Sequence, residues 1–249
     1  NMTSICFYFK VHQPFRIKNF TIFNIGNSSD YFDDEKNKFY LDRIVEKCYL
    51  PTLKIFYELI KETNFRFKFS VGITGTLIEQ LQLWHPEVID WWQKISSTGC
   101  VEFTGETYYH SLSSLYSKEE FKFQVNHHKQ LIKNLFSQEP IIFSNTELIY
   151  FDDLEVILEK LNFKGIITEG VDRILEWRSP NFVYHTPNQK LKVLLRNYKL
   201  SDDISFRFSN KNWEEWPLTA DKFLFWLTQL KNNSEVINLF MDFETFGAV

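Results

Sequence analysis

The chain has 249 residues, of which 44% are hydrophobic and 24% charged, and its formal net charge is −4. This composition is globular, which excludes an intrinsically disordered chain, and the length suits one large domain or two small ones. A weakly acidic chain is not expected to carry a surface dedicated to nucleic acid or anionic membranes. Its apolar runs are shorter than the roughly 18 residues of a membrane-spanning helix.

The cysteines and aromatic residues indicate the cellular compartment and the kind of ligand. Cys6, Cys48 and Cys100 form an odd set without a CxxC motif, which argues against a disulfide framework or structural zinc site. Strand-like residues begin at Ile5, so we expect no signal peptide and a reducing, cytoplasmic location. The aromatic share of 18% favours a carbohydrate cleft, because aromatic faces stack on sugar rings.

Segments typical of buried strands alternate with helical segments along the chain. The predicted strands are Ile5–Val11, Phe65–Val71, Val101–Thr107, Pro140–Phe143, Gly165–Thr168, Leu191–Leu195 and Val236–Met241. The predicted helices are Leu41–Thr63, Thr76–Trp84, Pro86–Ser96, Ser117–Phe136, Asp152–Leu161 and Thr219–Lys231. Pro51 should kink or split the first helix. The long loop Phe15–Tyr40 is expected to be functional.

The repeated order of strand then helix, with strands that are mostly apolar, predicts a parallel sheet buried on both faces. Such strands close into a β/α barrel or spread into an open sheet. Val11–Pro14, after the first strand, has no GxGxxG motif, so a nucleotide-binding open sheet is the weaker interpretation. Without a repeat or linker, we expect residues 1–249 to form a single barrel domain.

Polar side chains follow the predicted strands, where the carboxyl ends of a barrel's strands build an active site. They are His12, Gln13, Glu102, Glu106, His110, Asn145, Glu147, Glu169, Asp172, Asn197, Asp203, Asp242 and Glu244. Each of them could equally be an ordinary exposed loop residue. Taken together, they predict one rim at which distant parts of the sequence meet.

Glu147 and Asp242 stand out because each follows an apolar strand and has apolar neighbours. Such neighbours should limit solvation of both carboxyl groups and raise their pKa values. In a retaining glycosidase one carboxylate attacks the anomeric carbon, while the other donates a proton to the leaving oxygen; the two lie about 5–5.5 Å apart. Two structural carboxylates that cap helices or pair with arginine are the alternative.

A metal site is a second interpretation. His12, His110, Asp242 and Glu244 are residue types that bind zinc, although the chain has no HExxH motif. A metal-dependent polysaccharide deacetylase is therefore the competing enzyme class, with His12 and an aspartate as the expected ligands. Catalysis by a Ser-His-Asp triad is disfavoured because no GxSxG motif occurs.

Four short motifs, in order along the chain, resemble those of glycoside hydrolase family 57. This family includes α-amylases, amylopullulanases, branching enzymes and 4-α-glucanotransferases. The matching stretches are His12–Pro14, Gly99–His110, Phe143–Tyr150 and Met241–Gly247. The third motif has the form seen in a subgroup of α-amylases.

The resemblance implies an incomplete (β/α)7 barrel, a retaining mechanism and no required metal or other cofactor. It makes Glu147 the nucleophile and Asp242 the general acid/base, acting on an α-1,4-glucan or maltooligosaccharide. His12, Glu102 and His110 would bind the donor sugar, and Asp203 is a weaker addition. Members of the family continue past the fourth motif into a helical region, so a chain that stops at Val249 is expected to be a truncated form.

The sequence leaves the outcome of the reaction open. Hydrolysis and transglycosylation differ only in whether water or a sugar hydroxyl attacks the glycosyl-enzyme. Besides the deacetylase, a carbohydrate-binding barrel without catalytic activity remains an alternative.

Overall fold

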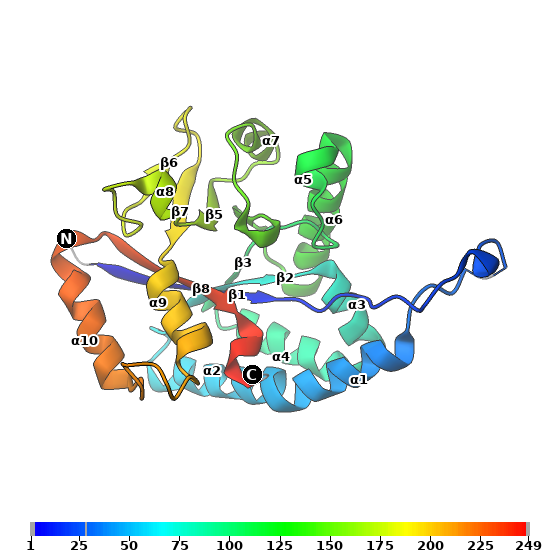
Figure 1. Ribbon diagram of the computed structural model, residues 1–249, viewed down its shortest axis with the longest axis horizontal. Helices are drawn as coiled ribbons and strands as arrows, with labels where there is room; N and C mark the ends of the chain where they lie inside the picture. Colours follow the sequence, from blue (N-terminus) through cyan, green and yellow to red (C-terminus); the bar gives the residue numbers. More distant parts are fainter. Residues whose placement is uncertain (1–2, 28, 248–249) are drawn as a thin grey trace.

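The computed structural model describes residues 3–27 and 29–247 as an α/β fold with strands at its centre (Figure 1). Two four-stranded sheets have the orders β3-β2-β1-β8 and β4-β5-β7-β6. The pairings within them are parallel, except that β6 runs antiparallel to β7. The strands are β1 (Ser4–Val11), β2 (Phe69–Ile73), β3 (Val101–Phe103), β4 (Ile142–Ser144), β5 (Gly165–Glu169), β6 (Tyr184–His185), β7 (Lys192–Arg196) and β8 (Val236–Asp242).

Hydrogen bonds join the two sheets at both pairs of edges. Just past β3, the Gly105 N–H donates to the Ile142 carbonyl, and the Ser144 N–H donates to Gly105, each at 2.8 Å. On the other side, the Asn197 N–H donates to the Asn238 carbonyl at 2.9 Å. The parallel strands β1, β2, β3, β4, β5, β7 and β8 therefore surround one interior. The predicted α/β fold, an incomplete (β/α)7 barrel, is confirmed, and β6 is an addition at the edge of one sheet.

Helices cover the outside of this wall. In Figure 1 the strands run across the centre, with α1, α2 and α4 below them and α5, α6 and α7 above. None of the helices within residues 3–27 and 29–247 has the length and apolarity to cross a membrane. The helices are α1 (Asp34–Ile44), α2 (Leu50–Glu62), α3 (Gly75–Trp84), α4 (Pro86–Ser96), α5 (Ser113–Tyr116), α6 (Lys118–Phe136), α7 (Leu154–Lys160), α8 (Asp172–Leu175), α9 (Tyr198–Asp202) and α10 (Ala220–Leu230).

The predicted break near Pro51 is present as a π-turn. Residues Val45–Tyr49 form π-helix η2 between α1 and α2, and Pro51 lies in the first turn of α2. The helical segment starts earlier than predicted, because the Asp33 side chain accepts a hydrogen bond from the Lys36 N–H and caps α1. The long loop after β1 is correspondingly shorter, and its residues around η1 (Ile22–Asn24) project from the barrel (Figure 1).

The predicted second strand is wrong in position. Phe65, expected to open it, has a left-handed backbone (φ 61°) in the turn that ends α2. Strand β2 begins only at Phe69. The alternating apolar residues from Phe65 onward have the pattern of a strand, but the first of them lie in the turn after α2. A local period of two does not distinguish these uses.

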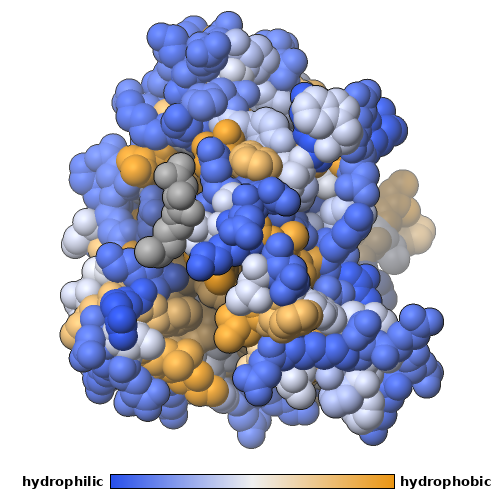
Figure 2. Space-filling view, turned by 90° about the vertical axis from the view of Figure 1, so that its left-hand side faces the viewer, coloured by the Kyte–Doolittle hydropathy of each residue, from blue (hydrophilic) through white to orange (hydrophobic). Residues whose placement is uncertain are grey.

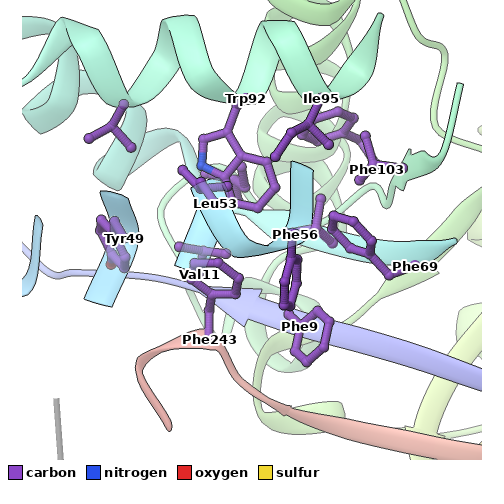
Figure 3. Packing of buried hydrophobic residues seen from close by; sticks show 14 of the residues in the cluster. Phe9, Val11, Tyr49, Leu53, Phe56, Phe69, Trp92, Ile95, Phe103 and Phe243 are labelled. Carbon is purple, nitrogen blue, oxygen red and sulfur yellow. The ribbon is translucent and has the colours of Figure 1, made fainter. Parts of the chain in front are cut away.

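Alternation along each strand separates an outer core from the barrel interior. Outward side chains from β1, β2, β3 and β8 pack with α2, α3 and α4 in one large cluster. Figure 3 shows Phe9, Phe56 and Phe69 meeting there, with Phe243 close to Trp92; the Trp92 and Phe243 ring centroids are 5.5 Å apart. A second cluster covers β4, β5 and β7. Because Phe243 directly follows Asp242, this packing fixes the end of β8.

The surface is mainly hydrophilic, with local apolar areas. Figure 2 looks onto the end of the molecule that lies on the left in Figure 1, and apolar atoms gather in its lower half. Helix α10, at the lower left in Figure 1, carries the exposed side chains of Leu224 and Phe225.

Candidate active site

A cavity of about 670 Å³ opens at the carboxyl end of the strands. Inward-facing residues from the last positions of several strands line it, as barrel geometry predicts. The charged and imidazole side chains in the lining include Lys10, His12, His110, Glu147, Arg196, Asp242 and Glu244.

Glu147 lies on a strained turn directly after β4. Its backbone is left-handed (φ 55°, ψ 24°), as is that of Leu148 (φ 53°). Buried polar neighbours hold the turn: the Thr146 hydroxyl donates to the Ser111 carbonyl at 2.7 Å, and the Asn145 amide donates to the Ile149 carbonyl at 3.0 Å. Such strain costs on the order of 1–3 kcal/mol and concentrates at functional sites. The turn lifts the Glu147 carboxylate into the mouth of the cavity.

His110 contacts Glu147 from the segment that follows β3. Its Nε2 lies 3.1 Å from the Glu147 carboxylate, and its own backbone is left-handed (φ 53°). Burial lowers the pKa of His110, and the Lys10 ammonium nearby adds to this effect. A neutral His110 with its proton on Nε2 donates a hydrogen bond to Glu147. This bond orients the carboxylate.

His12 lies beside His110, with ring centroids 4.3 Å apart. Its Nδ1 is 2.8 Å from the Thr74 hydroxyl, the N-cap of α3. Burial, followed by the neighbouring His110, lowers the pKa of His12 to about 3. Both imidazoles are thus neutral near pH 7. In this form each ring can donate a hydrogen bond to a hydroxyl group or accept one from it.

Asp242 ends β8 inside the same cavity as Glu147. Its surface is reached by solvent, but protein atoms surround it on most sides. This partial desolvation raises the pKa of Asp242; Lys10 opposes the rise, and the negative charge of Glu147 adds to it. Glu147 itself has a side chain that is 71% exposed. The prediction of limited solvation is therefore wrong for Glu147, whose strained turn places it further out.

Glu102 does not join these residues, in contrast to the prediction. It lies in β3 in register with Ser70, and both line a second cavity with Cys6, at the amino end of the strands. Parallel strands all point the same way, so a residue near the start of a strand lies at the opposite end of the barrel. Glu106, two inward positions later, is the glutamate of this segment that reaches the catalytic end.

Asp203 is also outside the cavity lining. It is buried in the π-turn Asp203–Arg207 and forms an ion pair with Arg207 one turn later. Its neighbours Ser205 and Phe206 reach the cavity instead. The Asp203–Arg207 ion pair spans this turn from its first residue to its last.

Two cationic residues of the site were not among the predicted site residues. Lys10 extends from β1 into the cavity, and Arg196 links three elements: it donates to the Phe240 carbonyl at 2.8 Å, to Glu169 at 3.3 Å and to Asp202 at 2.5 Å. The sequence does contain an indication of Lys10, since a lysine within the apolar stretch Ile5–Val11 would be a buried charge, and a buried charge needs a partner.

Comparison with known proteins gives the family. A model described as "Glycosyl hydrolase family 57" matches residues 6–249. The chain belongs to glycoside hydrolase family 57. A curated relative from Methanocaldococcus jannaschii, named "Putative alpha-amylase", is 45% identical over 246 residues, which cover 98% of this chain and 51% of that protein. The chain thus spans about half the length of the curated relative it matches.

Solved structures of other proteins share this fold. The 4-α-glucanotransferase from Thermococcus litoralis superimposes with a TM-score of 0.75 at 17% identity, covering 99% of this chain and 34% of that one. A structure from Mycobacterium smegmatis, titled "putative polysaccharide deacetylase", gives 0.60 at 12% identity and covers 98% and 77%. At these identities the likeness concerns the fold alone, which does not decide between the two enzyme classes.

The arrangement of side chains does not suit the metal-dependent alternative. Within residues 3–27 and 29–247, no group of three or more His, Cys, Asp or Glu side chains is placed so that it could hold a metal ion. His12, the expected ligand, has its Nδ1 against Thr74, and the lysine Lys10 reaches the place beside Asp242. A fixed ammonium there disfavours a second cation. In this family 57 chain, the cavity at the carboxyl end of the strands is therefore lined by carboxylates, imidazoles and fixed cations.

Proposed function

We propose that this chain is the catalytic barrel of a retaining glycoside hydrolase or transglycosylase that acts on α-1,4-glucans. The observation that carries the proposal is that Glu147 and Asp242, from separate strands, line one cavity at the catalytic end. The family match supports the substrate class, since the relatives named above include a 4-α-glucanotransferase. We also propose that residues 1–249 form one catalytic domain, and that its three unpaired thiols suit a reducing, cytoplasmic compartment.

In the first step, the Glu147 carboxylate attacks the anomeric carbon while Asp242 gives its proton to the glycosidic oxygen. The carbon–oxygen bond breaks, the shortened glucan leaves as an alcohol, and the sugar is bound to Glu147 as an ester. The raised pKa of Asp242 keeps a protonated fraction available for this transfer. His110 holds the exposed Glu147 carboxylate in its attacking orientation.

In the second step, Asp242 acts as a base. It removes a proton from water or from a sugar hydroxyl, whose oxygen attacks the anomeric carbon and frees Glu147. Water gives hydrolysis and a sugar hydroxyl gives transfer of the glucan chain. His12 and His110, both neutral, are placed to bind hydroxyl groups of the donor sugar.

Trapping the covalent intermediate tests this proposal. We expect that incubation with a fluorinated α-glucosyl donor, followed by mass spectrometry of peptides, shows one sugar added to Glu147. A Glu147→Gln variant should form no adduct and lose turnover by on the order of 10⁴-fold or more while it still binds maltooligosaccharide. Glu159→Gln, an exposed change on α7, is the matched control and should behave as the parent protein.

The competing classes give other results. A metal-dependent deacetylase would lose its activity with EDTA and would form no glycosyl adduct. A barrel that only binds carbohydrate would retain maltooligosaccharide without turnover in the parent protein.

A further inference from the structure

Lys10 and Asp242 are partners in the register of two adjacent parallel strands. Lys10 pairs with Asp242 on one side and with Gly72 on the other. Because β1 and β8 run in the same direction, both side chains of the pair point into the barrel at the same height. An inward-facing lysine in register with the proposed acid/base is a feature that the reaction scheme above does not use.

Glu106 holds the Lys10 ammonium in place. The two form a direct ion pair, in which the glutamate side chain is 1% exposed and that of lysine 16%. Space for Glu106 depends on Gly72, since a Cβ at this position would lie 2.8 Å from the Glu106 carboxylate and 2.3 Å from the Tyr8 hydroxyl. The side chain of Lys10 is thus a fixed positive charge rather than a mobile one.

The surroundings of Asp242 show which charges act on it. Lys10 on β1 and Arg196 on β7 are positive. Glu147 on η3 (Thr146–Leu148) and Glu244 on η6 (Phe243–Phe246) are acidic, as is Glu106, which pairs with Lys10. His110, in the segment after β3, and Tyr8, in β1, are neutral neighbours. Lys10 is the charge that most favours ionised Asp242, and Glu147 opposes it.

We infer that Lys10 is a positioning residue for Asp242, whose fixed charge converts Asp242 from an acid into a base once Glu147 has become an ester. This inference rests on the proposed function. Before the first step the negative charge of Glu147 counteracts Lys10, so Asp242 holds its proton more tightly than it would beside Lys10 alone. When the sugar is bound to Glu147, that negative charge is lost and the charge of Lys10 remains. Asp242, which has just given its proton away, then stays ionised and accepts a proton from the incoming water or hydroxyl.

The test measures the protonation of Asp242 directly. Carbon-13 NMR of the full chain, labelled at the aspartate carboxyl groups and assigned with Asp242→Asn, gives the titration midpoint of this one group. The variant Lys10→Met with Glu106→Gln removes both charges and keeps the shapes, which avoids a buried unpaired carboxylate. We expect its Asp242 midpoint to rise by about one pH unit, the size of effect that a nearby opposite charge produces.

Two further variants sharpen the result. Glu147→Gln imitates the uncharged ester and should lower the Asp242 midpoint in the presence of Lys10. Adding the Lys10→Met and Glu106→Gln changes to it should raise the midpoint again. Lys10→Gln with Glu106→Gln gives the same comparison if the first pair fails to fold.

An unchanged Asp242 midpoint after removal of the pair overturns the inference. Because the titration needs no turnover, this failure is distinct from failure of the proposed function, which shows as the absence of a Glu147 adduct in the parent protein. For an active enzyme, the alkaline limb of the pH dependence of kcat/KM should move upward together with the NMR midpoint. A purely structural role of Lys10 would change neither.

Discussion

The hydroxyl of Tyr49 donates a hydrogen bond of 2.5 Å to the carboxyl group of Glu244. Tyr49 belongs to the π-turn that interrupts the first helix, and Glu244 lies two residues after Asp242. Next to it, the Cys48 thiol donates to the Phe243 carbonyl at 3.2 Å. The π-turn therefore ties an outer helix to the backbone that carries the proposed acid/base, in keeping with the frequent occurrence of π-turns at functional sites.

Tyr49→Phe should weaken both stability and activity. The change leaves the half-buried Glu244 carboxyl without this hydrogen bond, which costs about 1–3 kcal/mol. We expect a free energy of unfolding lower by this amount in urea titrations, together with a reduced kcat. Tyr57→Phe, at a half-buried tyrosine of α2 whose ring packs against Trp91, is the control and should change neither. Equal stability of Tyr49→Phe and its parent would show that the bond contributes nothing.

Glu244 should make the protein less stable as the pH rises. Burial raises the pKa of Glu244 from 4.5 to about 7. A raised carboxyl pKa means that the folded state holds the proton more tightly than the unfolded state. The associated stability is complete below pH 4.5 and is lost as the pH rises through about 7. We expect the stability of the parent relative to Glu244→Gln to fall by about 3 kcal/mol across this interval.

The measurement is chemical denaturation of both proteins at a series of pH values. Glu244→Gln cannot titrate at this position. Subtracting its free energy of unfolding from that of the parent at each pH therefore removes the contribution of the other titrating groups. Parallel stability curves for the two proteins would contradict the raised pKa of Glu244.

His110→Ala should impair catalysis more than folding. It removes the donor that orients the exposed Glu147 carboxylate, and a nucleophile misplaced by about 1 Å can lose on the order of 10²-fold in rate. Steady-state kinetics on a maltooligosaccharide should show this loss in kcat/KM. His127→Ala is the control, because His127 is exposed and stacks on Tyr108 away from Glu147. A kcat/KM that matches the parent would remove His110 from the proposed site.

Glu155 should stabilise the folded chain near neutral pH and lose this effect in acid. Its buried carboxylate accepts hydrogen bonds from the Thr186 hydroxyl and from the N–H groups of Asn188 and Lys190. Although burial opposes ionisation, these donors lower the pKa of Glu155. A lowered carboxyl pKa gives stability above the unfolded-state value of 4.5 that disappears as the pH falls through the folded-state value.

We therefore expect Glu155→Gln to cost about 1–3 kcal/mol at neutral pH, with a smaller cost in acid. Thermal or urea unfolding at neutral and acidic pH measures both quantities. Glu159→Gln on the same helix removes an exposed carboxylate, 3.8 Å from the Lys190 ammonium, and should cost less than about 0.5 kcal/mol. A constant difference across the pH range would contradict the lowered pKa of Glu155.

The sequence alone determined the alternation of elements and the composition of the catalytic end. Apolar strands at Ile5–Val11 and Val236–Met241 are buried on both faces, and this requirement leaves a strong local pattern. Polar residues that follow such strands must lie at their carboxyl ends, so His12, Glu147 and Asp242 could be assigned to one end of the barrel. The predicted start of the helix Ser117–Phe136 also reflects a local interaction, because the Ser117 side chain accepts a hydrogen bond from the Glu120 N–H.

Only the tertiary structure decided which glutamate of Val101–Thr107 reaches the site and how charges combine there. Glu102 lies within β3 and Glu106 follows that strand, so the height of each in the barrel depends on where β3 pairs with β2. Similarly, the left-handed backbone of Glu147 depends on Thr146 and Asn145 finding partners more than 30 positions away. Lys10 gains its role from register with Asp242 at the other end of the chain. The local sequence pattern indicates which residues are buried, whereas strand register and long-range hydrogen bonds arise only when distant strands come together.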